Sequence, residues 1–418
     1  MNQDPDDERE QAMEIVIIGA GLAGVSAAEE LRAQGHSGAI TLIGSEPHPP
    51  YERPPLSKGL LLGSADVDSV FVHDAAWYAE QQIELLTGTT VTEIDLDTRH
   101  VVLADRQLRY DRLLLATGAR PRRLPLVDGS AADVVYLRTL EDALTLRARL
   151  TGHVLVIGAG WIGLEAAAAA REAGASVTVV ESASQPLAGV LGPVVAPVFA
   201  DLHRAHGVDL RLATSVASVD HIGGRTRVRL SDGHRLSPDL VLVGIGAEPY
   251  DHLAAKAGLA TDRGVLVDAF LRASDPHVYA AGDVAQHDHP LLGRIRVEHW
   301  DTAIQQGRHA ARSMLGEEQP YARQPYFFTD QYDLGMEYVG HVGPEGSDEV
   351  IVRGDLEARV FSAFWLRGAT VLAGMHVNDW DAIEAIRRIV AAPAVDTAAL
   401  RDPSIPLDAV ADVAPGRR

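Results

Sequence analysis

Cysteine is absent from this sequence of 418 residues. The absence excludes structural disulfides, an iron–sulfur cluster held by cysteines of this chain, and catalysis by a thiolate. It also excludes a dithiol relay, in which a pair of cysteines passes electrons between a cofactor and a substrate. Whatever reaction the chain carries out does not pass through a thiol of its own.

Positive charge and long apolar runs are also scarce. There are 37 lysines and arginines against 58 aspartates and glutamates, and the formal net charge of −21 argues against a nucleic-acid partner. The longest apolar run, 154–170, contains Glu165 and is explained by a strand, a turn and a helix, so no membrane span is predicted. The acidic residues 1–12 resemble neither a secretory signal nor a transit peptide, and we expect a disordered tail there and a cytoplasmic protein.

The glycine turn at residues 19–24 has the pattern Gly-x-Gly-x-x-Gly. A buried strand, 15–18, precedes it, a helix follows, and a second strand, 40–43, ends before Glu46, which lies 22 residues beyond Gly24. In such a βαβ unit the first glycine makes the turn, the second lets a pyrophosphate approach the backbone, and the third lets helix and strand pack closely. Glycines also serve plain turns, but this setting predicts a dinucleotide site.

The same pattern returns 139 residues later, at 158–163, between the strands 154–157 and 177–180. Two such turns in one chain predict two dinucleotides, and the usual chemical reason is electron transfer between a nicotinamide and a flavin. Glu181 follows the second strand, where a carboxylate accepts the ribose hydroxyls and repels a 2′-phosphate. Because residues 182–185 supply no arginine, NADH is predicted over NADPH.

The order of elements predicts an α/β fold with two Rossmann-like dinucleotide-binding domains and a small C-terminal α+β domain. A strand ending at Gly282 and Asp283, followed by a helix at 302–315, returns the chain to the first domain. Aromatic residues crowd the chain beyond Tyr326, and we expect loose packing after Ala394. The expected division is an FAD-binding domain at 13–123 and 250–326, an NAD-binding domain at 124–249, a C-terminal reductase domain at 327–408 and a tail at 409–418.

A proline-rich loop, residues 44–58, follows the first nucleotide unit. Its five prolines are expected to keep it out of helix and sheet and to stiffen it, so that Arg53 and Lys58 help hold a ring system; a surface linker is the alternative. A buried strand at 110–115 ends in a small-residue turn, where backbone lies against a cofactor. Asp283 is placed to accept hydrogen bonds from sugar or ribityl hydroxyls.

With these pieces in order, the chain resembles the flavin-dependent ferredoxin reductase family, which includes putidaredoxin reductase and the reductase components of aromatic-ring dioxygenases. The resemblance covers about residues 15–407. Its most specific marks are Pro50 to Lys58, Leu115 to Gly118, Tyr136 to Asp142, Gly163 to Glu165, Ala281 to Asp283 and Phe328 to Asp333. It implies an FAD-dependent enzyme that takes a hydride from NADH and passes electrons singly to a [2Fe-2S] ferredoxin, which serves a cytochrome P450 or a ring-hydroxylating oxygenase.

The resemblance also implies the cofactor contacts. The FAD pyrophosphate is expected on Gly19, Gly21, Ala23 and Gly24, the adenosine ribose on Ser45 or Glu46, and the adenine near Val91. Further flavin contacts are expected from Arg53, Lys58, Ala116, Thr117, Gly118, Arg138, Gly282, Asp283 and Trp300, and NADH contacts from Gly158, Gly160, Trp161, Ile162, Gly163, Glu181 and Gly246. The chain departs from the family at two places, since relatives often have an acid at Ser45 and commonly read Asn-Arg-Pro at Asn378, Asp379 and Trp380.

Lys58, Glu165 and Trp300 are the predicted catalytic residues. Hydride transfer needs the nicotinamide C4 and the flavin N5 at roughly 3–3.5 Å, so positioning and charge matter more than acid catalysis. Lys58 would place a positive charge beside N5 and O4, and Glu165 would pair with Lys58 and touch the nicotinamide side. The alternative for Glu165 is a solvated helix residue. Trp161 and Trp300 are candidates for stacking on the ring systems, with core packing the alternative for Trp161.

No metal is predicted, because His287 and His289 lie in an expected loop without a third ligand and are taken as surface groups. Ferredoxins are usually acidic, as this chain is, so we expect a local basic patch that includes Arg53, Arg294 and Arg296 and a turnover that falls with salt. Two other functions stay open. One is an NADH oxidase or diaphorase that uses oxygen or a quinone, and the other is a redox-sensing interaction flavoprotein resembling apoptosis-inducing factor. The oligomeric state is not predicted.

Overall fold

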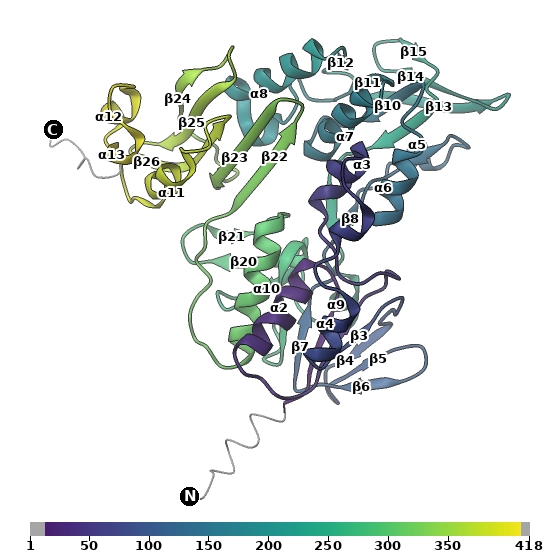
Figure 1. Cartoon of the computed structure of the whole chain (residues 1–418), viewed down its shortest axis with the longest axis vertical. Coiled ribbons are helices and arrows are strands. Elements are labelled where there is room, and N and C mark those ends of the chain that lie inside the picture. The colour runs from purple at the N-terminus through teal and green to yellow at the C-terminus, as the bar shows by residue number, and fades with distance from the viewer. Residues whose placement is uncertain (1–12, 411–418) are drawn as a thin grey trace, which may run out of the picture. The chain divides into compact units, whose positions relative to one another are not determined.

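The structure is a computed structural model that describes residues 13–410, so the tails expected at 1–12 and 411–418 lie outside the described residues. The chain packs into two compact units, each discontinuous in sequence (Figure 1). Unit 1 contains residues 13–53, Asp66–Arg120 and Ala247–Arg323, and unit 2 contains Pro54–Ala65, Pro121–Gly246 and 324–410. The segment Pro54–Ala65 therefore groups with unit 2. The assignment of an FAD-binding, an NAD-binding and a C-terminal reductase domain stays a prediction.

A five-stranded sheet forms the centre of unit 1, in the order β19-β7-β1-β2-β3 with every pairing parallel. The strands are β1 (Ile15–Ile18), β2 (Ile40–Ile43), β3 (Ile83–Leu86), β7 (Arg112–Leu115) and β19 (Val278–Ala280). Isoleucine, leucine and valine dominate them, because strands covered on both faces bury side chains in both directions. Helices α2 (Leu22–Ala33) and α10 (Trp300–Met314) lie side by side in Figure 1. Their backbones touch, since a Cβ on Gly307 would lie 2.2 Å from the carbonyl oxygen of Ala23.

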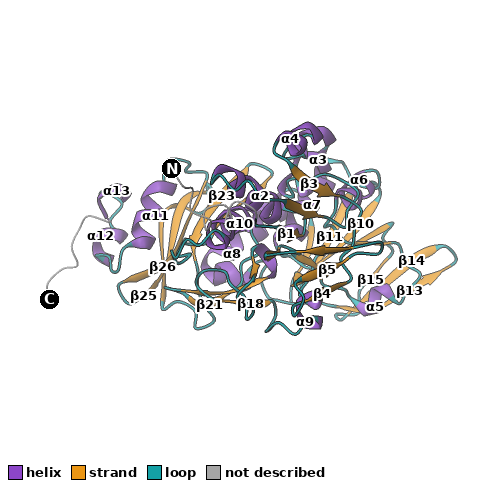
Figure 2. Ribbon diagram, turned by 90° about the horizontal axis from the view of Figure 1, so that it is seen from below, coloured by secondary structure: helices purple, strands orange, loops and turns teal. Residues whose placement is uncertain are grey.

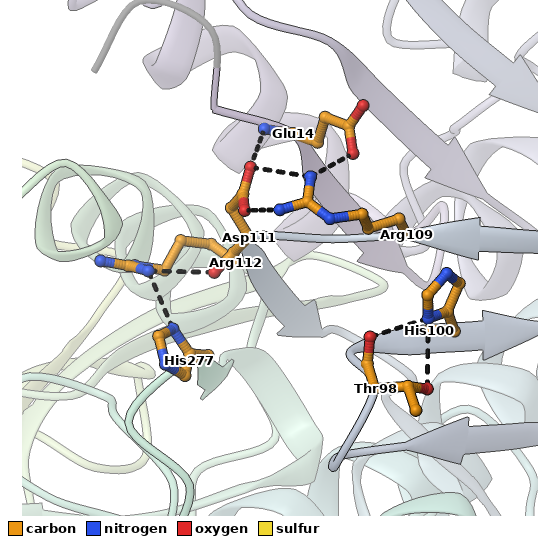
Figure 3. A network of polar contacts seen from close by, with 7 residues as sticks. All are labelled: Glu14, Thr98, His100, Arg109, Asp111, Arg112 and His277. Carbon is orange, nitrogen blue, oxygen red and sulfur yellow. Dashed lines mark hydrogen bonds and ion pairs between the residues drawn. The ribbon is translucent and has the colours of Figure 1, made fainter. Parts of the chain in front are cut away.

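Smaller elements complete unit 1. They are the sheet of β4 (Glu93–Asp95), β5 (His100–Val102) and β6 (Gln107–Arg109), the sheet of β18 (Val265–Val267), β20 (Ala285–His289) and β21 (Gly293–Ile295), the pair β8 (Ala119–Pro121) and β17 (Ala247–Pro249), and the helices η2 (Val67–Val70), α4 (Ala75–Glu80), α9 (His252–Lys256) and η3 (Gly282–Val284). Figure 3 shows the polar network where β1 and β7 begin. Asp111 accepts a hydrogen bond from the Glu14 N–H at 2.9 Å and pairs with Arg109 at 2.6 Å, which ties the starts of the two strands together.

Unit 2 contains a second five-stranded parallel sheet, in the order β12-β11-β10-β16-β9. Its strands are β9 (Val134–Val135), β10 (His153–Ile157), β11 (Ser176–Val180), β12 (Asp209–Arg211) and β16 (Leu240–Val243). Helix α7 (Trp161–Glu172) follows β10 through the second glycine turn, and α8 (Ala188–Ala205) bends at Gly192, just before Pro193. The other elements of this part are η1 (Pro54–Ser57), α3 (Gly59–Leu62), α5 (Pro125–Asp128), α6 (Leu140–Arg147), β13 (Val216–Ile222), β14 (Arg225–Leu230) and β15 (Arg235–Leu236).

A five-stranded antiparallel sheet ends the sequence of unit 2, in the order β22-β23-β26-β25-β24. Its strands are β22 (Tyr326–Gln331), β23 (Leu334–Gly340), β24 (Glu349–Asp355), β25 (Val360–Arg367) and β26 (Thr370–Val377). Helix α11 (Ile383–Ala391) packs on β26 and β23, as Figure 2 shows for β26, and α12 (Thr397–Arg401) and α13 (Leu407–Val410) follow. The loose packing expected after Ala394 is wrong, because Val395, Leu400 and Val410 are buried in the core around α11.

The predicted α/β class is confirmed by the two parallel sheets and the C-terminal antiparallel sheet. The prediction for the proline-rich loop is wrong in part, since Pro54–Ser57 form a 3₁₀ helix and Tyr51 pairs with Phe71 in a single bridge. The fixed φ of proline suits the first turn of a helix, where its missing N–H is not needed. Within residues 13–410, no helix is both long and apolar enough to cross a membrane.

Candidate functional site

The first glycine turn can be built only with glycine at two of its three positions. Gly19 has a φ of +116°, and a Cβ there would lie 2.1 Å from the carbonyl oxygen of Ala116, at the end of β7. A Cβ on Gly24 would lie 2.0 Å from the carbonyl oxygen of Gly19, so helix α2 rests directly on the turn. Both distances are far inside van der Waals contact, and any side chain would force the backbone apart.

Gly21 differs from the other two glycines, because a Cβ there would meet nothing within 4 Å. Gly21 is also the N-cap of α2, which has no side-chain cap and no acidic residue in its first turn. The first N–H groups of a helix have no partner within the helix, and its N-terminus carries a partial positive charge. Open space next to these donors is what a pyrophosphate requires, so the turn fits the FAD pyrophosphate predicted there.

The second glycine turn repeats this arrangement within unit 2. Gly158 has a φ of +102°, with a virtual Cβ 2.4 Å from the carbonyl oxygen of Gly244, and a Cβ on Gly163 would lie 2.2 Å from the carbonyl oxygen of Gly158. At Gly160 the nearest atom would be 3.9 Å away, and α7 begins there without a side-chain cap or an acidic first turn. The same two structural glycines and one open position therefore occur in both units.

The predicted FAD contacts in unit 1 gather at one edge of its sheet. Most of them follow the carboxyl ends of four neighbouring strands, β1, β2, β7 and β19, which is where open α/β sheets bind ligands, whereas Val91 follows β3 and Trp300 begins α10. Thr117, after β7, donates its hydroxyl to the carbonyl oxygen of Tyr250 at 2.8 Å, and Gly118 has a φ of 70°. The members of this group are Gly19, Gly21, Ala23, Gly24, Ser45, Glu46, Val91, Ala116, Thr117, Gly118, Gly282, Asp283 and Trp300, with Arg53 also in unit 1.

The acids expected to hold the two riboses are bound in different ways. Glu181 directly follows β11, and its carboxylate accepts backbone N–H groups of Ala159, inside the glycine turn, and of Ala183, each at 2.8 Å. Glu46 instead pairs with Arg53 at 2.8 Å and accepts the hydroxyl of Tyr51. Both acids lie at the sheet edge of their unit, and their roles toward the riboses stay predictions.

Glu165 is the centre of a buried polar cluster in unit 2. It lies on α7 and is 5% exposed, so the alternative of a solvated helix residue is wrong. Its carboxylate pairs with the Lys58 ammonium at 2.7 Å, as expected, and also accepts the hydroxyls of Thr329, at 2.6 Å, and Ser57. A buried carboxylate is costly unless it is paired and hydrogen-bonded, and here three donors, one of them the positively charged Lys58, compensate it.

Ser57 and Thr329 were not among the predicted site residues. Both lie inside the stretches that carry the family resemblance, Pro50 to Lys58 and Phe328 to Asp333, and that was the available signal. Lys58 also lies 5.4 Å from the ring centroid of Phe328, a distance that suits a cation–π contact. The cluster therefore joins α7 to the segments on either side of it in sequence.

The two tryptophans have different surroundings. Trp161 begins α7 and makes edge-to-face contacts with Phe199 and Phe327, at centroid distances of 5.7 and 5.1 Å. These contacts favour the packing alternative for Trp161. Trp300, the third predicted catalytic residue, begins α10 and belongs to unit 1, whereas Lys58 and Glu165 belong to unit 2.

The remaining predicted residues of unit 2 occupy turns and helix starts. Arg138 donates its backbone N–H to Asp142 at 3.0 Å, next to the capping box that begins α6. Gly246 follows β16 with a φ of 94°, and Ile162 lies exposed in the first turn of α7. The predicted site residues of unit 2 are Lys58, Arg138, Gly158, Gly160, Trp161, Ile162, Gly163, Glu165, Glu181 and Gly246.

The expectation that His287 and His289 are surface groups is wrong. Both lie on β20 rather than in a loop, and His287 is 1% exposed, because neighbouring side chains such as Tyr321 cover it. Burial lowers the pKa of His287 to about 3, so it is neutral at physiological pH. In the part of the chain that the structure describes, no group of three or more His, Cys, Asp or Glu residues is placed to hold a metal ion.

The expected basic patch is neutralised within unit 1. Arg53 pairs with Glu46, Arg294 lies 3.7 Å from Asp288, and Arg296 lies 2.6 Å from Glu298. Each of the three arginines therefore has an acid beside it, and a partner would meet three ion pairs rather than three free cations. The salt dependence expected from this patch loses its structural basis.

At the C-terminal departure from the family, Asn378 and Trp380 organise the start of β23. The Asn378 side chain accepts the Gly335 N–H at 2.8 Å and donates to the carbonyl oxygen of Asp333 at 3.1 Å. Trp380 is 59% exposed, yet its indole covers Gly335 so closely that a Cβ there would lie 2.4 Å from the ring. Asn378 thus fixes the backbone at this position, and Trp380 presents an aromatic surface to solvent.

Comparison with known families agrees with this geometry. The family model described as pyridine nucleotide-disulphide oxidoreductase matches residues 13–307, and the model described as reductase C-terminal matches residues 326–411. The class defined by the fold and the glycine turns is thus that of pyridine-nucleotide oxidoreductases. The chain belongs to this family, and within it to the ferredoxin reductases that include putidaredoxin reductase.

Three relatives illustrate this membership. The chain is 42% identical to putidaredoxin reductase of Pseudomonas putida, over 87% of this chain and 88% of that protein. It is 40% identical to the ferredoxin–NAD(+) reductase component of the anthranilate 1,2-dioxygenase system of Burkholderia cepacia, over 94% and 98% of the two chains. Among solved structures, the covalent putidaredoxin reductase–putidaredoxin complex matches with a TM-score of 0.91 and 40% identity, covering 95% of this chain and 97% of that one.

Proposed function

We propose that this protein is an FAD-dependent NADH:ferredoxin oxidoreductase. The observation that carries the proposal is the pair of glycine turns, each with an open position at a free helix N-terminus, at Gly21 and at Gly160. One chain that holds two dinucleotides is suited to moving electrons between them. FAD binds at the turn of unit 1, and NADH binds at the turn of unit 2, where Glu181 accepts the ribose hydroxyls.

Bound FAD would supply a group that can take up a hydride from NADH and release two electrons one at a time. The residues of the protein bind the two dinucleotides, orient their reacting rings and provide charge beside them. Lys58, from Pro54–Ala65, and Glu165, from Pro121–Gly246, form a charged pair within unit 2, and they are proposed to provide charge to the reacting rings. Trp300 is proposed to stack on the ring edge from unit 1.

The electron acceptor is a separate [2Fe-2S] ferredoxin. The relatives named above are ferredoxin reductases, and one solved relative is a complex with putidaredoxin. Since the sequence contains no cysteine, it has no dithiol that could take the electrons instead. A cytochrome P450 or a ring-hydroxylating oxygenase is the proposed consumer of the reduced ferredoxin. We also propose a cytoplasmic location, where NADH is made.

Steady-state turnover tests the proposal against the other functions. Purified holoenzyme with NADH and a [2Fe-2S] ferredoxin should reduce two ferredoxins for each NADH, because NADH supplies two electrons. Without ferredoxin, in air, NADH loss should be at least about tenfold slower. Equal NADH loss without ferredoxin would indicate an oxidase, and a long-lived reduced flavin that ferredoxin does not reoxidise would indicate a redox sensor.

A further inference from the structure

Glu165 is the end of a chain of buried polar side chains in unit 2. The Thr329 hydroxyl lies 2.6 Å from the Glu165 carboxylate, Gln331 Nε2 lies 3.2 Å from Thr329 Oγ1, and His203 Nε2 lies 2.9 Å from Gln331 Oε1. Thr329 and Gln331 are each 1% exposed, and His203 is 0% exposed. Thr329 and Gln331 come from β22, and His203 comes from α8. A continuous hydrogen-bonded path therefore runs inward from the Lys58–Glu165 pair.

The direction of every hydrogen bond in this chain follows from the carboxylate. An ionised carboxylate only accepts, so Thr329 must donate its one hydroxyl hydrogen to Glu165. The Thr329 oxygen can then only accept, so Gln331 must turn its amide N–H toward it and its carbonyl toward His203. Since that carbonyl only accepts, His203 must carry its hydrogen on Nε2. The ionisation of Glu165 thus fixes the tautomer of a histidine three side chains away.

The reverse set of hydrogen bonds, in which Glu165 donates, is disfavoured at His203. A protonated Glu165 could donate to Thr329, which would then donate to a flipped Gln331, and His203 would carry its hydrogen on Nδ1. His203 Nδ1 is buried with no hydrogen-bond partner among the described residues. In that direction an N–H on Nδ1 would be buried without an acceptor, and buried N–H groups without a partner are rarer in proteins than acceptors that lack a donor. The hydrogen bonds from Thr329 to His203 therefore favour the ionised form of Glu165.

The charged groups near the chain support the same state. Lys58 is the cation in contact with Glu165. Asp330, the neighbour of Thr329 on β22, has a pKa raised first by burial and also by the carboxylates of Glu165 and Glu337, against the lowering effect of Lys58, so its own negative charge is disfavoured there. The pKa of His203 is lowered to about 4, chiefly by burial and to a smaller extent by the nearby His206, while the hydrogen bond to Gln331 acts in the opposite direction. His203 is therefore neutral at physiological pH and acts as a hydrogen-bond donor rather than as a second cation.

We infer that Thr329, Gln331 and His203 are positioning residues that hold Glu165 ionised and directed at Lys58. The inference rests on the proposed function, in which that ion pair provides charge at the reacting rings. It assigns a task to β22, which belongs to the reductase C-terminal region, residues 326–411, and a task to a histidine of α8. These residues act through Glu165 and are not themselves required to touch a cofactor.

The test compares three threonine variants with the wild-type holoenzyme. Thr329→Val keeps the shape of the side chain but removes the hydroxyl that donates to Glu165, and Thr329→Ser restores that hydroxyl. The control, Thr226→Val, removes a buried hydroxyl of β14 that takes no part in the hydrogen bonds between Glu165 and His203. The rate of flavin reduction by NADH is measured against pH. In Thr329→Val the acidic limb of this profile should move up by about one pH unit, because the Glu165 carboxylate loses a hydrogen bond that stabilises its charged form.

Thr329→Ser should restore the wild-type profile, and Thr226→Val should leave it unchanged. The inference is overturned if the profiles of Thr329→Val and the wild type coincide, or if Thr226→Val shifts the profile equally. If the wild type is not reduced by NADH at all, the proposed function fails, and a second readout then decides the inference alone. That readout is the ¹⁵N NMR spectrum of the histidines, in which His203 should be the Nε2–H tautomer in the wild type. A His203 that carries its hydrogen on Nδ1 would contradict the inferred direction.

Discussion

The two glycine turns of this chain share a backbone design but differ in the position of the acid. In unit 2 the residue after β11 is Glu181, and its carboxylate accepts the N–H of Ala159. In unit 1 the residue after β2 is Gly44, and a Cβ there would lie 2.7 Å from the Cβ of Ala20, the counterpart of Ala159. Unit 1 thus has no room for a side chain at the position that holds the acid in unit 2.

This difference separates the features that serve any dinucleotide from the features that select one dinucleotide over another. The structural glycines, the uncapped helix and the open position occur in both units, so they serve the shared pyrophosphate. The acids do not correspond, since Glu46 lies farther along the chain and is held by Tyr51 and Arg53. The acid is therefore the part that distinguishes the site proposed for FAD from the one proposed for NADH.

The largest effect is expected from breaking the shared structural glycines. Gly24→Ala and Gly163→Ala place a Cβ 2.0 and 2.2 Å from a backbone carbonyl oxygen, and each should lower the free energy of unfolding by about 3 kcal/mol. Gly189→Ala in α8 is the control, because a Cβ there meets nothing within 4 Å. Thermal unfolding would check this, and a Gly24→Ala variant as stable as the control would show that α2 does not rest on the turn.

Acid should weaken both units, because each buries a neutral histidine. The pKa is about 3 for His287 in unit 1 and about 4 for His203 in unit 2, against an ordinary value of 6.5. Above pH 6.5 the folded and unfolded chains bind the same protons; below it only the unfolded chain gains them, so stability falls with pH down to the folded pKa. At about pH 5 each histidine should cost about 2 kcal/mol.

Calorimetry between about pH 7 and about pH 5 measures this loss. The variant His287→Leu should lose less stability than the wild type over the same interval, because the unfolded variant has one fewer group to protonate. Parallel curves for the two proteins would mean that His287 is protonated in the folded state.

The two glycines with open space beside them allow the proposed binding of pyrophosphate to be tested by substitutions that do not strain the backbone. Gly21 and Gly160 have negative φ values of −89° and −80°, and their virtual Cβ atoms meet no close neighbour. Alanine there should leave unfolding of the cofactor-free protein unchanged. Gly21→Ala should weaken FAD binding about tenfold or more, and Gly160→Ala should raise KM for NADH by about tenfold while FAD stays bound.

Flavin titration by fluorescence and steady-state kinetics would separate the two losses. If both variants weaken FAD and leave KM for NADH unaltered, the assignment of one dinucleotide to each unit is incorrect.

The last comparison concerns the acids. Glu181→Gln should reduce the preference for NADH over NADPH by about tenfold in the ratio of kcat/KM, because it removes the charge that repels a 2′-phosphate. Glu46→Gln in the other unit should leave this ratio unchanged, and this variant is the matched control. Equal changes in both variants would remove the proposed division between the acids.

Local patterns predicted most of the fold. The runs of isoleucine and valine in β1 and β10 and the glycines after them are neighbours in sequence, so their structure follows from short-range rules. The C-terminal sheet was expected from its aromatic, alternating residues. The packing beyond Ala394 was missed, because short helices such as α12 and α13 carry weak periodicity and gain their burial from tertiary contacts.

The candidate site was predictable only in part. The pair of Lys58 and Glu165 was expected through the family resemblance, whereas Ser57, Thr329, Gln331 and His203 were not. Thr329 lies 164 positions from Glu165, and Gln331 lies 128 positions from His203. No periodicity indicates which buried polar groups meet over such separations. His287 was misjudged for a related reason, since the sequence suggested a loop where the fold places the strand β20.

Anaerobic stopped-flow spectroscopy of the purified holoenzyme tests the central claim most directly. Addition of one equivalent of NADH should bleach the flavin absorption, and oxidised [2Fe-2S] ferredoxin mixed in afterwards should restore it, with two ferredoxins reduced per flavin. A protein that binds no flavin after reconstitution, or a flavin that NADH does not bleach, would contradict the account.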